Sequence, residues 1–358
     1  DKEDIEYLRS TGIFREEFLE YLLTFKFTGD IYAIPEGTVV FPREPLVKVI
    51  APIMQAQLIE TALLNIINHQ SLIATKTARI VHAARGDGVM EFGLRRAQGP
   101  DAGIYGARAA MIAGCIGTSN VLCGQMFDVP VKGTHAHSWI MSFPDELTAF
   151  RTYAKLYPTA CILLVDTYDT LGSGIPNAIQ VFKEMREAGI PLTFYGIRLD
   201  SGDLAYLSKK ARRMLDEAGF PDAVISASND LDEFLIQSLK EQGAAITSWG
   251  VGTHLITSKD CPSFGGVYKL AAIMGEDGAF IPKIKLSENS EKVTNPGNKT
   301  IYRIYEKETG KIKADLICLV EETFDEKEPL LLFDPLEPWK KTKLQGGSYT
   351  MREIMVPI

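Results

Sequence analysis

The sequence predicts an α/β protein with two parts: an irregular, TIM-like α/β barrel, and a second discontinuous α/β domain formed by the N- and C-terminal parts. Strand-like and helix-like segments alternate over Ser71–Met274, which indicates right-handed βαβ units and a parallel sheet. One of these segments, Cys161–Val165, is apolar throughout, as in a strand that is buried on both faces. The alternation is absent on either side of this region. We therefore expect domain boundaries that divide the chain into residues 1–70, 71–275 and 276–358.

The N-terminal part begins with apolar residues at helix spacing over residues 1–28. Short β runs separated by Pro-containing turns follow at Asp30–Ile34, Thr38–Phe41 and Leu46–Ile50. Two helices, Gln55–Asn68 and Ser71–Ala84, are expected next.

A closed or nearly closed barrel of roughly seven or eight strands fits the alternating region best. The expected strands are Val89–Gly93, Cys115–Thr118, Val129–Gly133, Cys161–Asp166, Leu192–Arg198, Ala223–Ala227 and Ala245–Gly250. The expected helices are Gly106–Ala113, Pro144–Leu156, Ala178–Ala188, Leu204–Ala218 and Leu231–Gln242. Short β runs return at Phe280–Leu286, Thr300–Lys307 and Ile312–Leu319. We expect the tail, Pro329–Ile358, to pack back onto the N-terminal β lobe.

The composition, 46% hydrophobic and 23% charged, is that of a globular protein. The net charge of −8 argues against a nucleic-acid partner but leaves room for a local basic pocket. No apolar segment approaches the roughly 20 residues that span a bilayer, so no membrane association is expected. The five cysteines are scattered without metal-ligand spacing, which predicts buried, reduced thiols in a cytoplasmic protein.

The candidate active site lies where the predicted strands end, because catalytic groups of parallel barrels gather at the carboxyl ends of the strands. Histidines occur in only one of these end segments, Gly133–Trp139, which contains His135 and His137. Imidazole exchanges protons near neutral pH and can attack phosphorus. The end segments hold no His/Asp/Glu cluster of the kind that keeps a permanent zinc ion. Their arginines, hydroxyls and glycines indicate that the site handles anions.

The segment Arg198–Asp203 combines an arginine with two carboxylates. The guanidinium of Arg198 suits a carboxylate or a phosphate in two-pronged fashion. Asp200, two residues further and on the same side of the strand, could accept hydrogen bonds from a ribose diol. Ser201 or Asp203 could instead cap the helix that begins near Leu204.

Glycines and hydroxyls supply a candidate phosphate site. Gly250 and Gly252 would let backbone N–H groups close around a phosphate, and Thr253 adds a hydroxyl donor. We assign Ser228, from the strand end Ser226–Asp230, to the same group. The alternative interpretation of Gly250–Thr253 is a tight turn.

Two further strand ends offer binding groups. Phe92 could stack on a flat heteroaromatic ring while Arg95 meets an anionic group, or Phe92 could be a core residue beside a salt-bridged rim. Asp166 or Asp169 could orient His137 or help to hold Mg²⁺ through water. A surface carboxylate is the alternative, above all for Asp169. The ligands of a metal ion are not assigned.

With these residues laid out, the chain resembles the nicotinate phosphoribosyltransferases from Asp30 to beyond Lys269. Four segments in one order carry the resemblance, which makes it far more specific than any single motif. They are Glu91–Pro100, Gly133–Ser138, Arg198–Leu204 and Gly250–Thr253.

The resemblance implies a type II phosphoribosyltransferase fold and a defined reaction. Nicotinate and phosphoribosyl pyrophosphate would give nicotinate mononucleotide and pyrophosphate, coupled to ATP hydrolysis, as the first step of nicotinate salvage to NAD. The implied cofactors are ATP and Mg²⁺, and the implied assembly is a homodimer with a shared active site. In relatives a tyrosine near the N-terminus stacks on the pyridine ring of the neighbouring subunit. This chain starts after that point, and its C-terminal end is cut short, so we expect the native termini to lie beyond it.

The resemblance also separates the two histidines. The histidine of the family's Ala-His-Ser triplet falls on His137, which implies phosphorylation by ATP, whereas the position of His135 is often apolar in relatives. The family's nicotinate contacts fall on Thr134 and Arg198, and the threonine near its ribosyl phosphate falls on Thr253. We assign catalytic roles to His137, Asp166 and Asp200.

Several rival functions fit parts of the sequence. Ser119 stands where nicotinamide-using relatives carry an aspartate that would repel a carboxylate, and this favours nicotinate over nicotinamide. A quinolinate site should show a denser basic cluster. A non-catalytic nucleotide sensor would have little need of a phosphorylatable histidine, and a barrel aldolase would need a lysine at a strand end.

Overall fold

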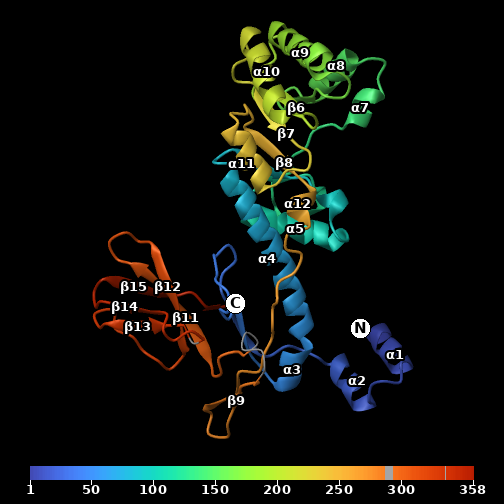
Figure 1. The fold of residues 1–358 in the computed structure, drawn as a ribbon. Helices are drawn as coiled ribbons and strands as arrows, with labels where there is room; N and C mark the ends of the chain where they lie inside the picture. Colours follow the sequence, from blue (N-terminus) through green and yellow to red (C-terminus); the bar gives the residue numbers. More distant parts are fainter. Residues whose placement is uncertain (287–292, 335) are drawn as a thin grey trace. The chain divides into compact units, whose positions relative to one another are not determined.

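The computed structural model describes residues 1–286, 293–334 and 336–358 (Figure 1). The chain divides into two compact units. Residues 65–266 form one of them, here called the central unit. Residues 1–64 and 267–358 together form the other, here called the terminal unit.

A parallel sheet of six strands forms the core of the central unit. Its strands are β3 (Gly88–Glu91), β4 (Gly117–Thr118), β5 (Cys161–Leu164), β6 (Tyr195–Leu199), β7 (Val224–Ala227) and β8 (Ser248–Val251). They are hydrogen-bonded in the spatial order β4-β3-β8-β7-β6-β5, and every pair is parallel. The carboxyl ends of all six strands therefore lie along one edge, where the following loops can meet.

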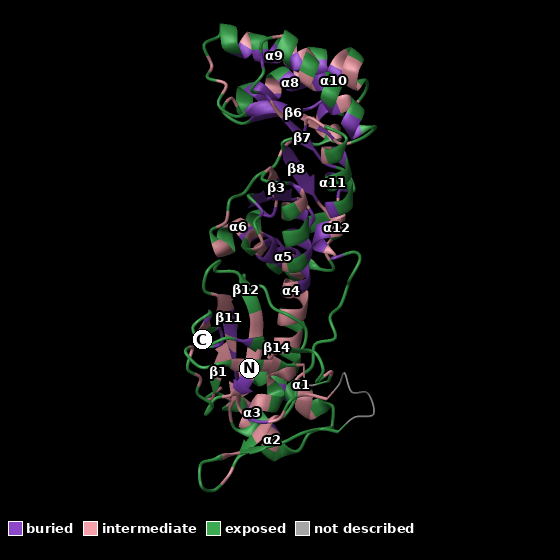
Figure 2. Ribbon diagram, turned by 60° about the vertical axis from the view of Figure 1, so that its left-hand side comes forward, coloured by how far each residue is buried: buried purple, intermediate pink, exposed green. Residues whose placement is uncertain are grey.

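Amphipathic helices connect these strands and cover the sheet. They are α5 (Pro100–Ile112), α8 (Glu146–Leu156), α9 (Ile175–Glu187), α10 (Leu204–Glu217) and α11 (Glu233–Glu241). Asp145, Asp203 and Asp232 cap α8, α10 and α11, because each carboxylate accepts a bond from a backbone N–H in the first turn. Figure 2 shows the strands buried, whereas the helices carry one buried and one exposed face. The largest fully buried side chain, Trp249, comes from β8.

The sheet is a curled half-barrel, not the closed or nearly closed barrel of seven or eight strands that the sequence predicted. The expected strand Val129–Gly133 is reduced to a single bridge between Val131 and Thr118. Pro130 has no N–H with which to extend this pairing. On the other side of the bridge, Asn120 already caps α6 (Val121–Phe127), so β4 ends after two residues. No strand pairing in the described part of the chain joins β4 to β5.

The terminal unit contains short helices and separate antiparallel sheets. Its helices are α1 (Lys2–Ser10), α2 (Glu16–Leu23) and α3 (Ile53–Leu58). One sheet joins β16 (Val356–Pro357), β1 (Asp30–Ala33) and β2 (Val47–Ile50), and another joins β12 (Ile312–Leu319), β11 (Lys299–Glu306) and β15 (Tyr349–Glu353). Two hairpins complete it: β9 (Ala272–Met274) with β10 (Phe280–Pro282), and β13 (Leu330–Phe333) with β14 (Lys341–Leu344). Because β16 pairs with β1, the last residues return to the first strand of the chain.

Two predicted elements differ in the structure. The run Thr38–Phe41 is not a strand, because side chains satisfy its backbone: the Val39 carbonyl accepts a bond from Arg303, and the Phe41 N–H donates to Glu44. The two helices expected before the sheet are replaced by α3 and a single long helix, α4 (Glu60–Ala83). The break predicted near residues 69–70 is therefore wrong, since no glycine or proline interrupts the chain there.

All five cysteines are free thiols. Cys115, Cys123, Cys161 and Cys318 are buried as predicted, whereas Cys261 is exposed. Among the described residues, no helix has the length and apolarity needed to cross a membrane. The same residues contain no group of three or more His, Cys, Asp or Glu side chains that could hold a metal ion.

Candidate active site

A cluster of polar side chains lies at the carboxyl edge of the parallel sheet. Its members lie at the end of β6, in the loops after β5, β6 and β7, or at the start of α7 (His137–Met141) and in the segment just before it. They are joined by short polar contacts and comprise Thr134, His137, Asp166, Thr167, Arg198, Asp200, Ser201 and Ser228. The structure thus brings together six of the candidate site residues and adds Thr167 to them. Ser201, considered above as a possible cap of α10, instead donates to Asp166, because Asp203 is the cap.

Arg198, on β6, is the hub of this cluster. Its Nε donates to Ser228 Oγ at 2.8 Å, and its Nη1 donates to Thr134 Oγ1 at 2.5 Å and to the His135 carbonyl at 3.4 Å. Its Nη2 donates to Asp200 Oδ1 at 3.2 Å. All three nitrogens are engaged, so the guanidinium is held in one orientation before any ligand arrives.

Asp200 connects Arg198 to His137. Burial raises the pKa of Asp200, but the hydrogen bond from Ser228 and the positive charge of Arg198 outweigh it and hold this pKa below its usual value. The carboxylate is therefore ionised at neutral pH. Its Oδ2 lies 3.5 Å from His137 Nε2.

Asp166 carries a buried oxygen that has no partner. Its side chain is 1% exposed, and its Oδ2 accepts bonds from the Asp200 amide at 2.8 Å and the Ser201 hydroxyl at 2.6 Å. Its Oδ1 accepts no hydrogen bond within the described residues and lies 3.9 Å from His137 Nε2. A buried carboxylate oxygen without a donor is unusual in a folded protein, and this one faces His137. Asp203, the other carboxylate of the motif, caps α10.

The two histidines occupy different surroundings. His137 begins α7, its Nδ1 lies 3.1 Å from Thr167 Oγ1, and its side chain is 37% exposed. His135 is buried, and its Nε2 accepts the Leu164 amide N–H at 3.3 Å. Burial above all, with the nearby charge of Arg198, lowers the pKa of His135 to about 4. His137 is thus accessible to a ligand, whereas His135 is a neutral structural residue.

The glycines predicted to bind phosphate lie beside Phe92. Gly250 is inside β8, not after it, because the strand ends at Val251 and not at Gly250 as predicted. A Cβ on Gly250 would lie 2.7 Å from two carbons of the Phe92 ring, so this glycine makes room for the ring. Only Gly252 and Thr253 remain in the turn, and Thr253 opens the four-residue helix α12 (Thr253–Ile256). Within the described residues, no hydrogen bond joins the Thr253 hydroxyl to the cluster.

Glu91 is a buried group that the sequence analysis left without a role. Its carboxylate is fully buried at the end of β3, where it accepts bonds from the Gly93 amide and from Thr118 Oγ1. Burial raises the pKa of Glu91. The signal available in the sequence was an acidic residue within the otherwise apolar run Val89–Gly93. Arg95, in the exposed 3₁₀ turn η1 (Leu94–Arg96), makes no hydrogen bond to the cluster among the described residues.

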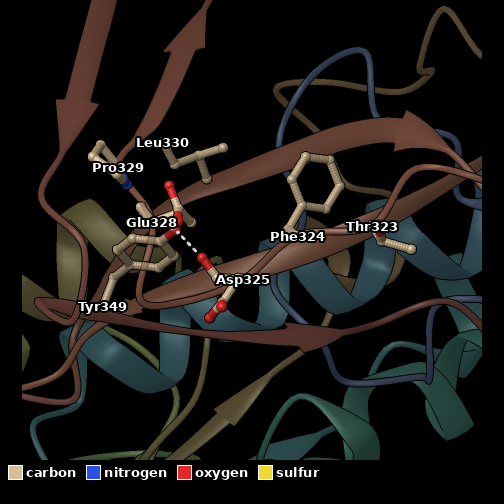
Figure 3. A pocket seen from close by; sticks show the side chains of 7 residues that line it. All are labelled: Thr323, Phe324, Asp325, Glu328, Pro329, Leu330 and Tyr349. Atoms are coloured by element: carbon tan, nitrogen blue, oxygen red, sulfur yellow. Dashed lines mark hydrogen bonds between the residues drawn. The ribbon is translucent and has the colours of Figure 1, made fainter.

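A separate cavity of about 390 Å³ lies in the terminal unit (Figure 3). Phe324 and Tyr349 line it together with the carboxylates Asp325 and Glu328. Its charged lining groups are acidic, so the cavity does not suit an anionic substrate. The cluster around Arg198 remains the candidate site.

Fold and site together define a parallel α/β protein with an anion-handling centre at the carboxyl edge of its sheet, which is where α/β barrels bind phosphates. Three family models match the chain. They describe the nicotinate phosphoribosyltransferase N-terminal domain at residues 1–68, the nicotinate phosphoribosyltransferase family at residues 88–303 and the corresponding C-terminal domain at residues 298–358.

Individual relatives agree with these matches. A nicotinate phosphoribosyltransferase of Bacillus subtilis is 53% identical over 333 residues, which cover 93% of this chain and 67% of the relative. One from Mycobacterium tuberculosis is 46% identical over 94% of this chain and 68% of the relative. The crystal structure of human nicotinic acid phosphoribosyltransferase superposes with a TM-score of 0.84 at 29% identity, covering 100% of this chain and 77% of the human one. The chain belongs to the nicotinate phosphoribosyltransferase family.

Proposed function

We propose that the chain catalyses the transfer of a phosphoribosyl group to nicotinate. The bond from the ribose anomeric carbon to pyrophosphate breaks, and a bond from that carbon to the pyridine nitrogen forms. The products are nicotinate mononucleotide and pyrophosphate, and the reaction is the first step of nicotinate salvage to NAD. The observation that carries this proposal is the cluster in which Arg198, Asp200 and His137 meet at the sheet edge, in a chain of this family.

Nicotinate would bind between Phe92 and Arg198. The Phe92 ring packs over Gly250 and offers a flat apolar face to a pyridine ring. Arg198 and Thr134, linked at 2.5 Å, would face the carboxylate of the substrate. Arg95, on the exposed turn that follows Phe92, would add a second positive charge.

The phosphoribosyl group would extend from this position toward the ends of β7 and β8. Ser228, whose hydroxyl already donates to Asp200, would line this position, and Gly252 and Thr253 would offer backbone N–H groups and a hydroxyl. Gly250 contributes indirectly, by admitting Phe92. In α/β barrels the loops after the last two strands frequently hold phosphates, which supports this orientation.

His137 would accept the γ-phosphoryl group of ATP, so that a bond from phosphorus to an imidazole nitrogen replaces the bond to ADP. The ring is accessible, and both of its nitrogens face polar partners: Thr167 on one side, Asp200 and Asp166 on the other. The two carboxylates would orient the imidazole for this attack. Hydrolysis of the phosphohistidine would then help to drive product formation.

Mg²⁺ fits the same carboxylates. The buried Asp166 Oδ1 lacks a hydrogen-bond donor within the described residues, and oxygen ligands of this kind suit a hard divalent cation. Asp166 and Asp200 would hold the ion. When bound, it would offset charge on the pyrophosphate leaving group.

The test combines product formation with labelling. Wild-type protein should convert nicotinate and phosphoribosyl pyrophosphate to nicotinate mononucleotide, and γ-labelled ATP should leave an acid-labile label. His137→Asn should lose the label, whereas His82→Asn, which changes an exposed histidine on α4, should keep it. Absence of product from the wild type would refute the transferase proposal. A label that survives in His137→Asn would refute the phosphohistidine.

Nicotinamide is the second candidate substrate, and one residue argues against it. Ser119 follows Thr118, and its amide donates to the Glu91 carbonyl at 3.1 Å. Nicotinamide-using relatives carry an aspartate at this position, which could accept hydrogen bonds from the substrate amide; serine offers no such carboxylate. The cation at Arg198 suits an acid and not an amide. Comparison of kcat/KM for the two pyridines tests this choice, and a preference for nicotinamide would overturn it.

We also propose that the chain forms a homodimer with a shared active site, and that the protein is located in the cytoplasm. Helix α6 exposes Val121, Leu122 and Met126, an apolar face that a second subunit would cover. Five free thiols fit a reducing compartment. Light scattering coupled to size-exclusion chromatography measures the assembly, and a monomer at micromolar concentration would contradict it.

A further inference from the structure

Lys76 is a buried lysine that bridges two segments near the proposed phosphate site. It comes from α4, and its side chain is 3% exposed. Its Nζ lies 2.7 Å from Glu233 Oε2 and also donates to Asp260 Oδ2. Glu233 is the first residue of α11, and Asp260 lies in the segment that follows α12.

These two segments follow neighbouring strands. The loop after β7 runs from Ser228 to the cap of α11, Asp232, and the turn after β8 runs from Gly252 through α12 to Asp260. A second contact joins the same pair, since His254 Nδ1 lies 3.5 Å from Asp232 Oδ2. Lys76 is thus the buried cation between the two loops that would hold the phosphoribosyl group.

The positive charge of Lys76 is needed to balance the carboxylates of Glu233 and Asp260. Burial lowers the pKa of Lys76, but the hydrogen bonds to Asp260 and Glu233 outweigh it and hold this pKa above its ordinary value. The Glu233 side chain is only 10% exposed. Removal of the ammonium would leave that carboxylate buried without its cation, and the loops would move to rehydrate it.

We infer that Lys76 is a positioning residue for the phosphate end of the site: its ion pairs hold the Ser228 loop and the Gly252–Thr253 turn at a fixed separation. The inference rests on the proposed function for the identity of the ligand. Lys76 itself touches no substrate in this scheme. Its effect is expected on the affinity for phosphoribosyl pyrophosphate, because only that substrate would contact both loops.

The chain offers a matched control on α11, the helix that begins with Glu233. Lys240, near the other end of α11, pairs with Asp87 at 2.5 Å, and these side chains are 20% and 16% exposed. Asp87 directly precedes β3 and also accepts a bond from Trp249 Nε1 at 3.0 Å. Lys240→Met therefore breaks a comparable ion pair at the opposite edge of the sheet.

The experiment compares Lys76→Met with Lys240→Met by steady-state kinetics and by hydrogen exchange. Lys76→Met should raise the KM for phosphoribosyl pyrophosphate by about tenfold or more, while the KM for nicotinate changes by less than about threefold. Lys240→Met should leave both KM values within about twofold of the wild type. Backbone amides over residues 252–260 should exchange faster in Lys76→Met and not in Lys240→Met.

Each outcome decides one question. A wild-type protein without transferase activity refutes the proposed function. An active wild type with equal KM shifts for both substrates in Lys76→Met, or with unchanged exchange over residues 252–260, refutes the role of Lys76 alone. If Lys76→Met does not fold, the double variant Lys76→Met/Glu233→Gln removes the orphaned charge. It should fold and keep the raised KM for phosphoribosyl pyrophosphate, and a wild-type KM in that variant would overturn the inference.

Discussion

Mild acid should destabilise the protein through His135. The imidazole is buried, accepts the Leu164 amide N–H at Nε2 and lies edge-on to Tyr153 with ring centroids 4.5 Å apart. Burial, with a smaller contribution from the charge of Arg198, lowers its pKa to about 4. In the unfolded chain the pKa of histidine is about 6.5.

The sign of the effect follows from which state binds the proton. Between pH 6.5 and pH 4 the unfolded chain protonates His135 and the folded protein does not, so the free energy of unfolding falls as the pH falls. One pKa unit corresponds to about 1.4 kcal/mol, so the loss from this residue is about 2 kcal/mol at pH 5. At pH 7.5 the contribution is close to zero, because both states are then neutral at this position.

Urea unfolding at pH 7.5 and at pH 5 measures this loss. His135→Gln removes the titrating ring and keeps an acceptor for the Leu164 amide, so its stability should change with pH by about 2 kcal/mol less than that of the wild type. His82→Gln, an exposed control, should retain the wild-type pH dependence. Parallel pH dependences for the wild type and His135→Gln would refute the assignment of His135 as a buried neutral residue.

Two substitutions test the geometry of the site. Arg198→Lys keeps the positive charge but loses the guanidinium nitrogens that donate to Ser228, Thr134 and Asp200. The kcat/KM for nicotinate should therefore fall by about 30-fold or more. A near-wild-type kcat/KM would contradict the role of the guanidinium. Gly250→Ala places a Cβ against the Phe92 ring, so it should lower the free energy of unfolding by about 1–3 kcal/mol and raise the KM for nicotinate. Gly133→Ala, whose Cβ would meet nothing within 4 Å, is its control, and equal effects in the two variants would count against the Phe92 contact.

The positions of most strands, and most members of the polar cluster around Arg198, could be predicted from the sequence, because both depend on local pattern. A run such as Cys161–Leu164, apolar at every position and buried at every position, identifies a strand within a parallel sheet. Once the strands are known, the rule that functional groups follow their carboxyl ends selects Asp166, Arg198 and Asp200. The structure then places these residues within hydrogen-bond reach of one another.

The features that the sequence could not give depend on partners far away in the chain. The Thr38–Phe41 segment has the composition of a strand. Its Val39 carbonyl, however, accepts a hydrogen bond from Arg303, which is 264 residues away in the sequence. Glu91 appears in the sequence as an ordinary carboxylate, and only the contacts with Gly93 and Thr118 make it a buried acceptor. The sheet joins its first and last strands, β3 and β8, and within the described residues it stays unpaired between β4 and β5; no local pattern in the sequence reports either feature.

The contacts of Arg198 limit what the site can bind. Its three nitrogens already donate to Ser228, Thr134 and Asp200, and the Asp200 carboxylate offsets part of its charge. An incoming carboxylate therefore gains less from net charge than from a guanidinium that is already oriented, since that orientation costs no further entropy on binding. A ligand that did not match this orientation would have to break the bond to Thr134 or to Asp200 and would leave a half-buried polar group unpaired. Selectivity for an acid at this position would thus arise from the hydrogen bonds that hold Arg198 as much as from its charge.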